Sequence, residues 1–279
     1  MIEAAVRRNL WVRMAAVAIL GVGASVTRAA VLWDNGPYLT NGFGLSIGWN
    51  QSASTPFRYA LTDDFTLTSP ATLSRLHCYG YMSGNVNNLP QIIAGYVRIL
   101  SDDNGAPGDV ILGDWTTPLE VAEEFTGDFY VGASDRGIHR VSIRLPQWEL
   151  CPGTYWVQYN LDNNDVRPSN GSLTGNYFST LTPAPPPEAN GYHYDVLTDT
   201  FFILDDPETG QGNAPPFSLE GDGCLVAGDL DGNGVCTIDD VPSFVSALLS
   251  GQFEPCADMN ADCVMNGLDV QAFVQCLLP

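Results

Sequence analysis

The C-terminal tail of this 279-residue chain repeats itself, because the pattern that begins at Asp229 recurs 29 residues later at Asp258. Oxygen-bearing side chains and apolar side chains keep the same spacing in both copies. Such repetition indicates two copies of one supersecondary unit that bury their apolar faces together. The matched positions are Asp229, Asp231, Asn233 and Asp240 with Asp258, Asn260, Asp262 and Asp269, followed by Val241, Phe244, Val245, Leu248 and Leu249 with Val270, Phe273, Val274, Leu277 and Leu278.

Each copy begins with a loop that carries oxygen side chains at positions 1, 3, 5 and 12. These can converge on a hard cation that takes six to eight oxygen ligands, while position 7 offers a backbone carbonyl and position 9 a side chain or a water. We expect the apolar side chain at position 7 to pack inward. The pattern predicts two Ca²⁺ sites, formed by Asp229, Asp231, Asn233, Val235, Thr237 and Asp240 and by Asp258, Asn260, Asp262, Val264, Asn266 and Asp269.

The apolar residues after each loop recur at i, i+3, i+4, i+7 and i+8, which predicts an amphipathic helix. Two such helices packed together would form a small all-α core. The alternative is that the Asp, Asn and Gly clusters are ordinary turns, with Asp240 and Asp269 capping the helices. Capping and metal ligation are compatible, so both interpretations stay open for these two aspartates.

Position 6 differs between the loops, with Gly234 in the first and Cys263 in the second. This position needs a positive φ, which costs a residue other than glycine about 1 kcal/mol. We therefore expect either a weaker second site or a disulfide that holds Cys263. The seven cysteines favour an oxidising compartment, and their odd number leaves at least one thiol without an intramolecular partner.

With these loops and helices, Gly228 to Pro279 resembles the type I dockerin domain of cellulosomal proteins. The resemblance implies two half EF-hands, a calcium-dependent fold and docking onto a cohesin domain. The tail departs from the family at loop positions 10 and 11, where Ile238-Asp239 and Gly267-Leu268 replace a Ser-Thr-like pair, and it has no basic residue. A cohesin-like protein, the chain's own N-terminal domain, or no partner at all therefore remain alternatives.

Residues 30–221 are predicted to be mainly β, since short β-branched and aromatic runs alternate with turn residues. A jelly-roll-like β-sandwich is the expected architecture, with an immunoglobulin-like sandwich as the alternative. Residues 222–227 would be a linker to the domain at 228–279, and Pro183–Pro187 a long surface loop. The clearest predicted strands are Thr72–Tyr81, Ile92–Leu100, Ile138–Leu145 and Thr154–Asn160. Apolar and polar residues alternate from Val141 to Leu145, so we expect this strand to have one buried and one exposed face.

Several short sequence segments in this region are similar to a recurrent β-sandwich domain of secreted bacterial proteins. The similarity implies a fold but no activity. These segments are Val31 to Gly36, Asp63 to Phe65, Gly105 to Gly108 and Gly153 to Trp156.

Residues 1–29 are predicted to be a signal peptide, cleaved after Ala29. Arg7, Arg8 and Arg13 precede an apolar run from Met14 to Val26, which is too short to span a bilayer comfortably. A membrane anchor is the alternative, and Sec and twin-arginine export both fit. We expect a secreted, periplasmic or cell-surface protein without a membrane span after cleavage. Its 7 arginines and 31 acidic residues would then repel nucleic acid and anionic membranes.

No residue is predicted to be catalytic. Ser46 matches a GxSxG motif but lacks the strand–turn–helix context of a nucleophile elbow, and only His77, His139 and His193 could act as its base. Adjacent carboxylates on a strand point to opposite faces, so neighbouring pairs are expected to be solvated turns instead of glycosidase sites. These pairs are Asp63-Asp64, Glu123-Glu124 and Asp205-Asp206.

Aromatic residues are frequent in the predicted sandwich, where exposed rings could stack on sugars and buried rings would be ordinary core. The leading hypothesis is an exported non-enzymatic binding or surface-structural protein. The alternative is a carbohydrate-binding or carbohydrate-active protein, associated with polysaccharide and tethered through its dockerin-like domain. The aromatic residues are Trp33, Trp49, Trp115, Trp148, Trp156, Tyr79, Tyr81, Tyr192 and Tyr194.

Overall fold

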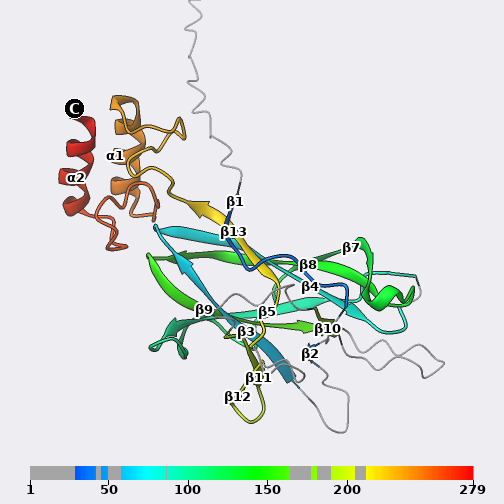
Figure 1. The fold of residues 1–279 in the computed structure, drawn as a ribbon. Coiled ribbons are helices and arrows are strands. Elements are labelled where there is room, and N and C mark those ends of the chain that lie inside the picture. The colour runs from blue at the N-terminus through cyan, green and yellow to red at the C-terminus, as the bar shows by residue number, and fades with distance from the viewer. Residues whose placement is uncertain are drawn as a thin grey trace, which may run out of the picture.

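The computed structural model describes residues 29–41, 45–49, 58–85, 87–163, 177–180, 190–204 and 212–278. The predicted signal peptide up to residue 28, the Pro183–Pro187 loop and the Asp205-Asp206 pair lie outside these ranges. Within them the chain is mainly β, as predicted, and forms two curled sheets followed by two short helices (Figure 1).

The first sheet is antiparallel throughout, and β4 lies at its centre between β13 and β8. A short strand, β10, continues along the β13 edge of β4. In spatial order the strands are β1 (Ala30–Asp34), β13 (Phe217–Gly223), β4 (Ala71–Met82), β8 (Gly137–Leu150) and β7 (Val121–Phe129), with β10 (Tyr177–Ser179) beside the end of β4.

The second sheet is also antiparallel, with β3 and β9 at its centre. β2 (Leu45–Trp49) pairs with β10 of the first sheet and with β3 of the second, so it joins the two. In spatial order the other strands are β12 (Thr200–Ile203), β11 (Tyr192–Asp195), β3 (Arg58–Leu67), β9 (Gly153–Asp162), β5 (Ala94–Asp102) and β6 (Pro107–Gly113).

The two sheets share one apolar core because alternate residues of their central strands point between them. Val141, Ile143 and Leu145 of β8 are buried, whereas Arg140 and Arg144 are exposed, as the period of two predicted. The four predicted strands are all present as β4, β5, β8 and β9. The second of them begins at Ala94, two residues later than expected.

The tail contains a 3₁₀ turn, η2 (Ile238–Asp240), and the helices α1 (Val241–Ser250) and α2 (Gly267–Leu277). The two helices lie side by side beyond the end of β13 (Figure 1). Phe244 and Phe273 stack between them with ring centroids 3.9 Å apart. β13 continues to Gly223, so the strand extends two residues into the segment predicted as a linker.

Three disulfides join six of the seven cysteines. Cys224–Cys256 and Cys236–Cys276 lie within the tail, and Cys151–Cys263 connects it to the sheets. Cys78 is the remaining thiol and is buried in the core, which confirms that one cysteine is left without an intramolecular partner. The disulfides indicate an oxidising compartment. None of the helices in the described ranges has the length and apolar character needed to cross a bilayer.

Candidate functional site

The first tail loop brings three carboxylates together. One oxygen from each of Asp229, Asp231 and Asp240 lies within 4.8 Å of the other two, a spacing at which they could hold a metal ion. Among the residues that the structure describes, no other trio of acidic, histidine or cysteine side chains meets this criterion. In the second loop Asn260 replaces the aspartate at position 3, so its side-chain oxygen is an amide oxygen instead of a carboxylate.

Asp240 organises the first loop from a fully buried position. Its Oδ1 accepts hydrogen bonds from the backbone N–H groups of Leu230 at 2.8 Å and Asp231 at 3.0 Å, and its Oδ2 accepts one from Thr237 at 2.8 Å. Burial acts to raise the pKa of Asp240, but these hydrogen bonds outweigh it and hold the pKa below its ordinary value. The carboxylate is therefore kept ionised.

The second loop repeats this arrangement with the same shift of 29 residues. Asp269 is buried and accepts hydrogen bonds from Met259 at 3.0 Å and Asn260 at 3.4 Å on Oδ1, and from Asn266 at 2.9 Å on Oδ2. The 29-residue sequence repeat is therefore matched by a repeat of the backbone hydrogen bonds that Asp240 and Asp269 accept.

The aspartate at position 1 binds the backbone of positions 5 and 6 in both loops. Asp229 accepts from Asn233 at 3.0 Å and from Gly234 at 2.7 Å. Asp258 accepts from Asp262 at 3.2 Å and from Cys263 at 2.8 Å. Burial raises the pKa of Asp258, and the charges of Asp269 and Asp262 add to this rise. A bound cation would oppose that repulsion.

The capping alternative holds in part, because Asp240 is the N-cap residue of α1 but its side chain makes no capping hydrogen bond there. The N-cap side chains are Thr237, whose Oγ1 accepts from the Asp239 N–H at 3.3 Å, and Asn266, whose Oδ1 accepts from the Leu268 N–H at 2.7 Å. Asp240 and Asp269 instead occupy the N3 position of a capping box. Each carboxylate therefore closes its loop and supports the start of its helix at the same time.

The position-7 side chains do not pack inward, which corrects the expectation for Val235 and Val264. They are 54% and 55% exposed. The small core between the helices consists of Phe244, Ala257 and Phe273, and Leu230, Met259 and Met265 pack against it from the loops.

The predicted apolar stripes are only partly buried. Val241, Phe244 and Leu248 of α1 pack together with Phe273 and Leu277 of α2. Two helices without a third layer share a single contact face, so the remaining stripe residues stay outside it. Val245, Leu249, Val270, Val274 and Leu278 are exposed.

The candidate catalytic groups that the structure describes in the two sheets do not assemble into a site. Leu45–Trp49 is a strand, β2, instead of the turn that a nucleophile elbow needs, and the Ser46 side chain lies outside the description. His77 contacts Ser142 at 2.7 Å and Glu220 at 3.2 Å, and burial lowers its pKa. His193 stacks on Tyr59 with centroids 4.4 Å apart.

The carboxylate pairs that the structure describes are in strands, so the expectation of solvated turns was wrong. Each pair divides between the two faces of its sheet, which leaves one member buried. Asp63 is buried and accepts from Asn35 Nδ2 at 2.6 Å, and Asp64 is half-buried. Burial, with the nearby charge of Asp64, raises the pKa of Asp63 to about 8.

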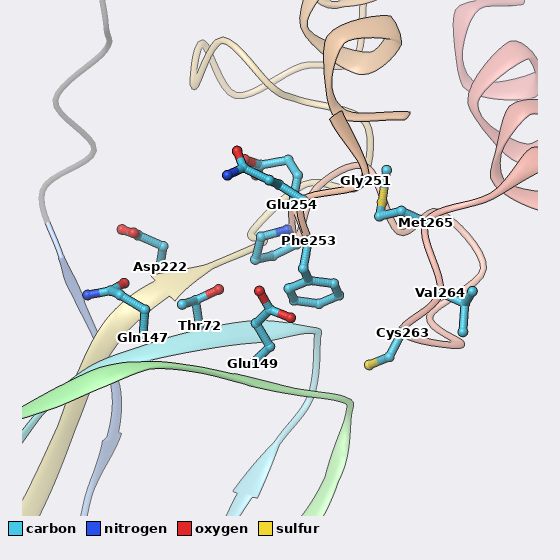
Figure 2. Close-up of a pocket in the computed structure, with 12 residues that line it drawn as sticks. Thr72, Gln147, Glu149, Asp222, Gly251, Phe253, Glu254, Cys263, Val264 and Met265 are labelled. Atoms are coloured by element: carbon cyan, nitrogen blue, oxygen red, sulfur yellow. The ribbon is translucent and has the colours of Figure 1, made fainter. Parts of the chain in front are cut away.

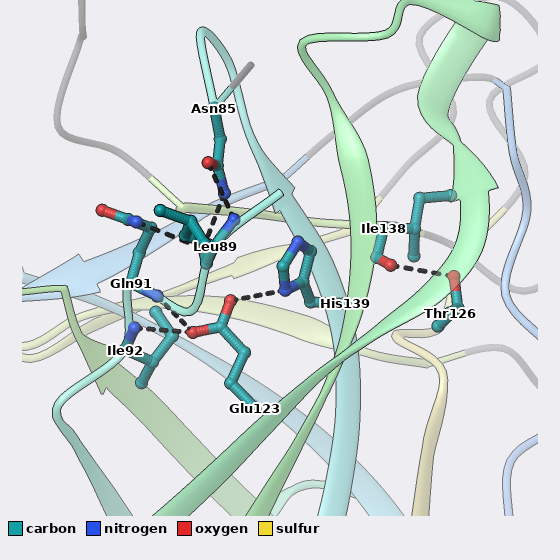
Figure 3. A network of polar contacts seen from close by, with 8 residues as sticks. All are labelled: Asn85, Leu89, Gln91, Ile92, Glu123, Thr126, Ile138 and His139. Carbon is teal, nitrogen blue, oxygen red and sulfur yellow. Dashed lines mark hydrogen bonds and ion pairs between the residues drawn. The ribbon is translucent and has the colours of Figure 1, made fainter. Parts of the chain in front are cut away.

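Glu123 of the second pair lies in a buried polar network that sequence reasoning missed (Figure 3). Its Oε1 is 2.9 Å from His139 Nδ1, and its Oε2 accepts from the N–H groups of Gln91 and Ile92 at 2.5 and 2.7 Å. Glu124 points outward to Arg140 at 2.8 Å. The network fixes the segment before β5 against β7 and β8, which is a structural role.

None of the eight predicted aromatic residues whose side chains the structure describes is exposed. Tyr81, Trp156 and Tyr194 are buried, and the other rings are half-buried. Trp49 lies outside the side chains described. The half-buried rings are Trp33, Tyr79, Trp115, Trp148 and Tyr192.

A cleft of about 750 Å³ lies between the rim of the sheets and the tail. It was not predicted from the sequence. Figure 2 shows Glu149 and Asp222 on the strand side, facing Phe253 and Glu254 of the segment after α1. Cys263 lines one end of this cleft, at the disulfide to Cys151.

Comparisons of the chain with models of known protein families, with curated proteins and with solved structures found no match.

Proposed function

We propose that the chain is an exported, non-enzymatic binding or surface-structural protein, in which a jelly-roll-like β-sandwich carries a dockerin-like tail stabilised by two Ca²⁺ ions. The observation that supports this most is the repeated hydrogen-bond network around Asp240 and Asp269. It fixes the backbone of both loops at matching positions, and in the first loop carboxylate oxygens of Asp229, Asp231 and Asp240 lie within 4.8 Å of one another.

In this proposal the first ion would be held by Asp229, Asp231 and Asp240, with Asn233, the Val235 carbonyl and Thr237 completing the shell. The second would be held by the matching Asp258, Asn260, Asp262, Val264, Asn266 and Asp269. Bound Ca²⁺ supplies positive charge that offsets the repulsion between carboxylates. Extracellular modules commonly bind it with Kd values of roughly 10⁻⁴ to 10⁻³ M, so a hundredfold excess over Kd adds about 2.7 kcal/mol per site.

Calorimetric titration of residues 30–279 with Ca²⁺ tests the proposal. We expect two sites in the natural sequence, loss of the first in Asp240→Asn and loss of the second in Asp269→Asn. Asp239→Asn is the matched control, because Asp239 is an exposed neighbour of Asp240 outside the predicted ligand set. Failure of the natural chain to bind Ca²⁺ at millimolar concentration would remove the proposal.

Docking of a protein partner, such as a cohesin-like domain, is the further part of the proposal. The exposed apolar residues of α1 and α2 support it, because Leu249 and Val245 of α1 are 83% and 44% exposed and Val274 of α2 is 46% exposed. A specific partner should bind in Ca²⁺, dissociate in chelator and bind Leu249→Asp at least tenfold more weakly. If Leu249→Asp bound the partner as tightly as the natural chain does, these helix residues would be excluded as the docking surface.

Carbohydrate binding is the second candidate, supported by a row of side chains across the outer face of the second sheet. Tyr192, Thr62, Gln158 and Arg98 are neighbours in this row, and both ends of the buried Gln158 amide lack a hydrogen-bond partner among protein atoms. Retention of the full chain on a polysaccharide column, lost in Gln158→Met, would favour this candidate. No retention on any polysaccharide tested would exclude it.

A further inference from the structure

Cys263 has the backbone conformation that a glycine has in the first loop. Its φ is 60°, in the left-handed region, and Gly234 at the matching position has a φ of 91°. Both residues use this conformation for the same purpose, since each N–H donates to an oxygen of the position-1 aspartate, at 2.8 Å for Cys263 and 2.7 Å for Gly234. A side chain at such a φ is unfavourable unless the surroundings hold it there.

The disulfide to Cys151 is the contact that can hold it. Cys151 lies in the two-residue corner between β8 of the first sheet and β9 of the second. The corner is braced by buried Leu150 and by the Tyr155 hydroxyl, which donates to the Cys151 carbonyl at 3.2 Å. The anchor is therefore part of the rigid sandwich and not of the tail.

Little else connects the second loop to the sandwich. The cleft of about 750 Å³ separates the tail from the ends of the strands, and its walls carry Glu149, Asp222 and Glu254, which repel one another (Figure 2). The chain itself crosses only at Gly223–Gly228, where the Cys224 N–H donates to the Pro70 carbonyl at 3.4 Å. Cys224–Cys256 fastens the residue after β13 to the segment after α1, and Cys151–Cys263 is the disulfide that reaches the second loop.

We propose that the Cys151–Cys263 disulfide is a positioning element for the second loop. The sandwich uses it to hold Cys263 in the left-handed conformation that glycine supplies unaided in the first loop. Calcium affinity of the second loop, but not of the first, then depends on this bond. This inference rests on the proposed function, in which both loops bind Ca²⁺.

The proposal makes the second loop sensitive to thiol reductants. A dithiol reductant would break the S–S bond by exchange, leaving Cys151 and Cys263 as thiols, and would itself be oxidised to a disulfide. The reductant supplies the two electrons and two protons that convert the disulfide into two thiols. The buried Cys78 thiol takes no part in it.

A matched pair of variants tests the proposal without free thiols at these sites. C151S/C263S removes the bond and leaves a side chain at position 263, whereas C151S/C263G removes the bond and supplies glycine. In calorimetric titrations of residues 30–279, we expect the first to bind Ca²⁺ about five- to thirtyfold more weakly in the second loop only. The second should bind as the natural chain does.

Amide hydrogen exchange in chelator gives a readout that needs no metal. The amides of Asp262 and residue 263 should exchange faster in C151S/C263S than in the natural chain and in C151S/C263G, while those of Asn233 and Gly234 stay unchanged as internal controls. Equal affinity and equal protection in both variants would overturn the proposal, as would equal loss in both. Absence of Ca²⁺ binding by the natural chain would instead overturn the proposed function, and the exchange data would still decide the positioning role.

Discussion

Two carboxylates in this chain have opposite pKa shifts, because the balance between burial and hydrogen bonding differs between their sites. Asp240 and Asp63 are both buried, yet the pKa of Asp240 is lowered and that of Asp63 is raised to about 8. Asp240 collects three backbone N–H donors, which compensate burial. Asp63 accepts hydrogen bonds from Asn35 Nδ2 and from the Asp64 N–H, which lower its pKa. Burial and the neighbouring charge of Asp64 raise the pKa by more than these bonds lower it.

Asp63 should therefore make stability depend on pH. Its folded-state pKa lies above the unfolded value, so the folded protein binds more protons between about pH 4 and pH 8 and loses stability as pH rises through this range, by up to about 1.4 kcal/mol per pH unit. Urea unfolding from pH 5 to pH 8 in saturating Ca²⁺ should show this slope, and Asp63→Asn should flatten it. The exposed control Asp109→Asn should keep the slope, and an unchanged slope in Asp63→Asn would contradict the assignment.

Some helices and strands could be predicted from the local sequence pattern alone, and others could not. The period of two in β8 predicted its buried face, and the 29-residue repeat predicted both loops and both helices. The outer face of β9 could not be predicted, because Trp156, Gln158 and Asn160 alternate as surface residues would and yet are buried. The β11–β12 hairpin and Trp115 lie beside this face, through contacts of residues distant in the sequence.

Gln158 should be a source of instability in β9 if no ligand or water reaches it. Both of its amide atoms are buried without a hydrogen-bond partner among the protein atoms, and such a group costs about 1–3 kcal/mol. Gln158→Met, which keeps the shape without the polar atoms, should raise the free energy of unfolding by about that amount in urea denaturation. A decrease would indicate that the amide is already paired in the folded protein, which would remove the observation that supports the carbohydrate candidate.

At the scale of the whole molecule, the disulfide between Cys151 and Cys263 joins two parts that otherwise meet across a cleft. Domains connected by a short linker and a small polar interface usually move relative to each other. The bond should suppress this motion, so the tail would hold one orientation relative to the sandwich.

Small-angle X-ray scattering of the full chain should detect the lost restraint. We expect a larger radius of gyration and a broader distance distribution for C151S/C263G than for the natural sequence, with Ca²⁺ bound in both. This variant keeps the loops intact, so the change would report on the tether alone. Identical scattering would show that noncovalent contacts hold the tail in place.

The sequence by itself determined the mainly β class, the strand faces, the repeated loops and the two helices. These depend on residues no more than about a dozen positions apart, whose hydrogen bonds and apolar spacing are local. Only the tertiary structure decided which cysteines pair, that Glu123 meets His139, that Val235 and Val264 face outward and that five of the ten stripe residues stay exposed. Those outcomes depend on which surfaces meet when distant segments pack, because burial and disulfide pairing are properties of the assembled chain.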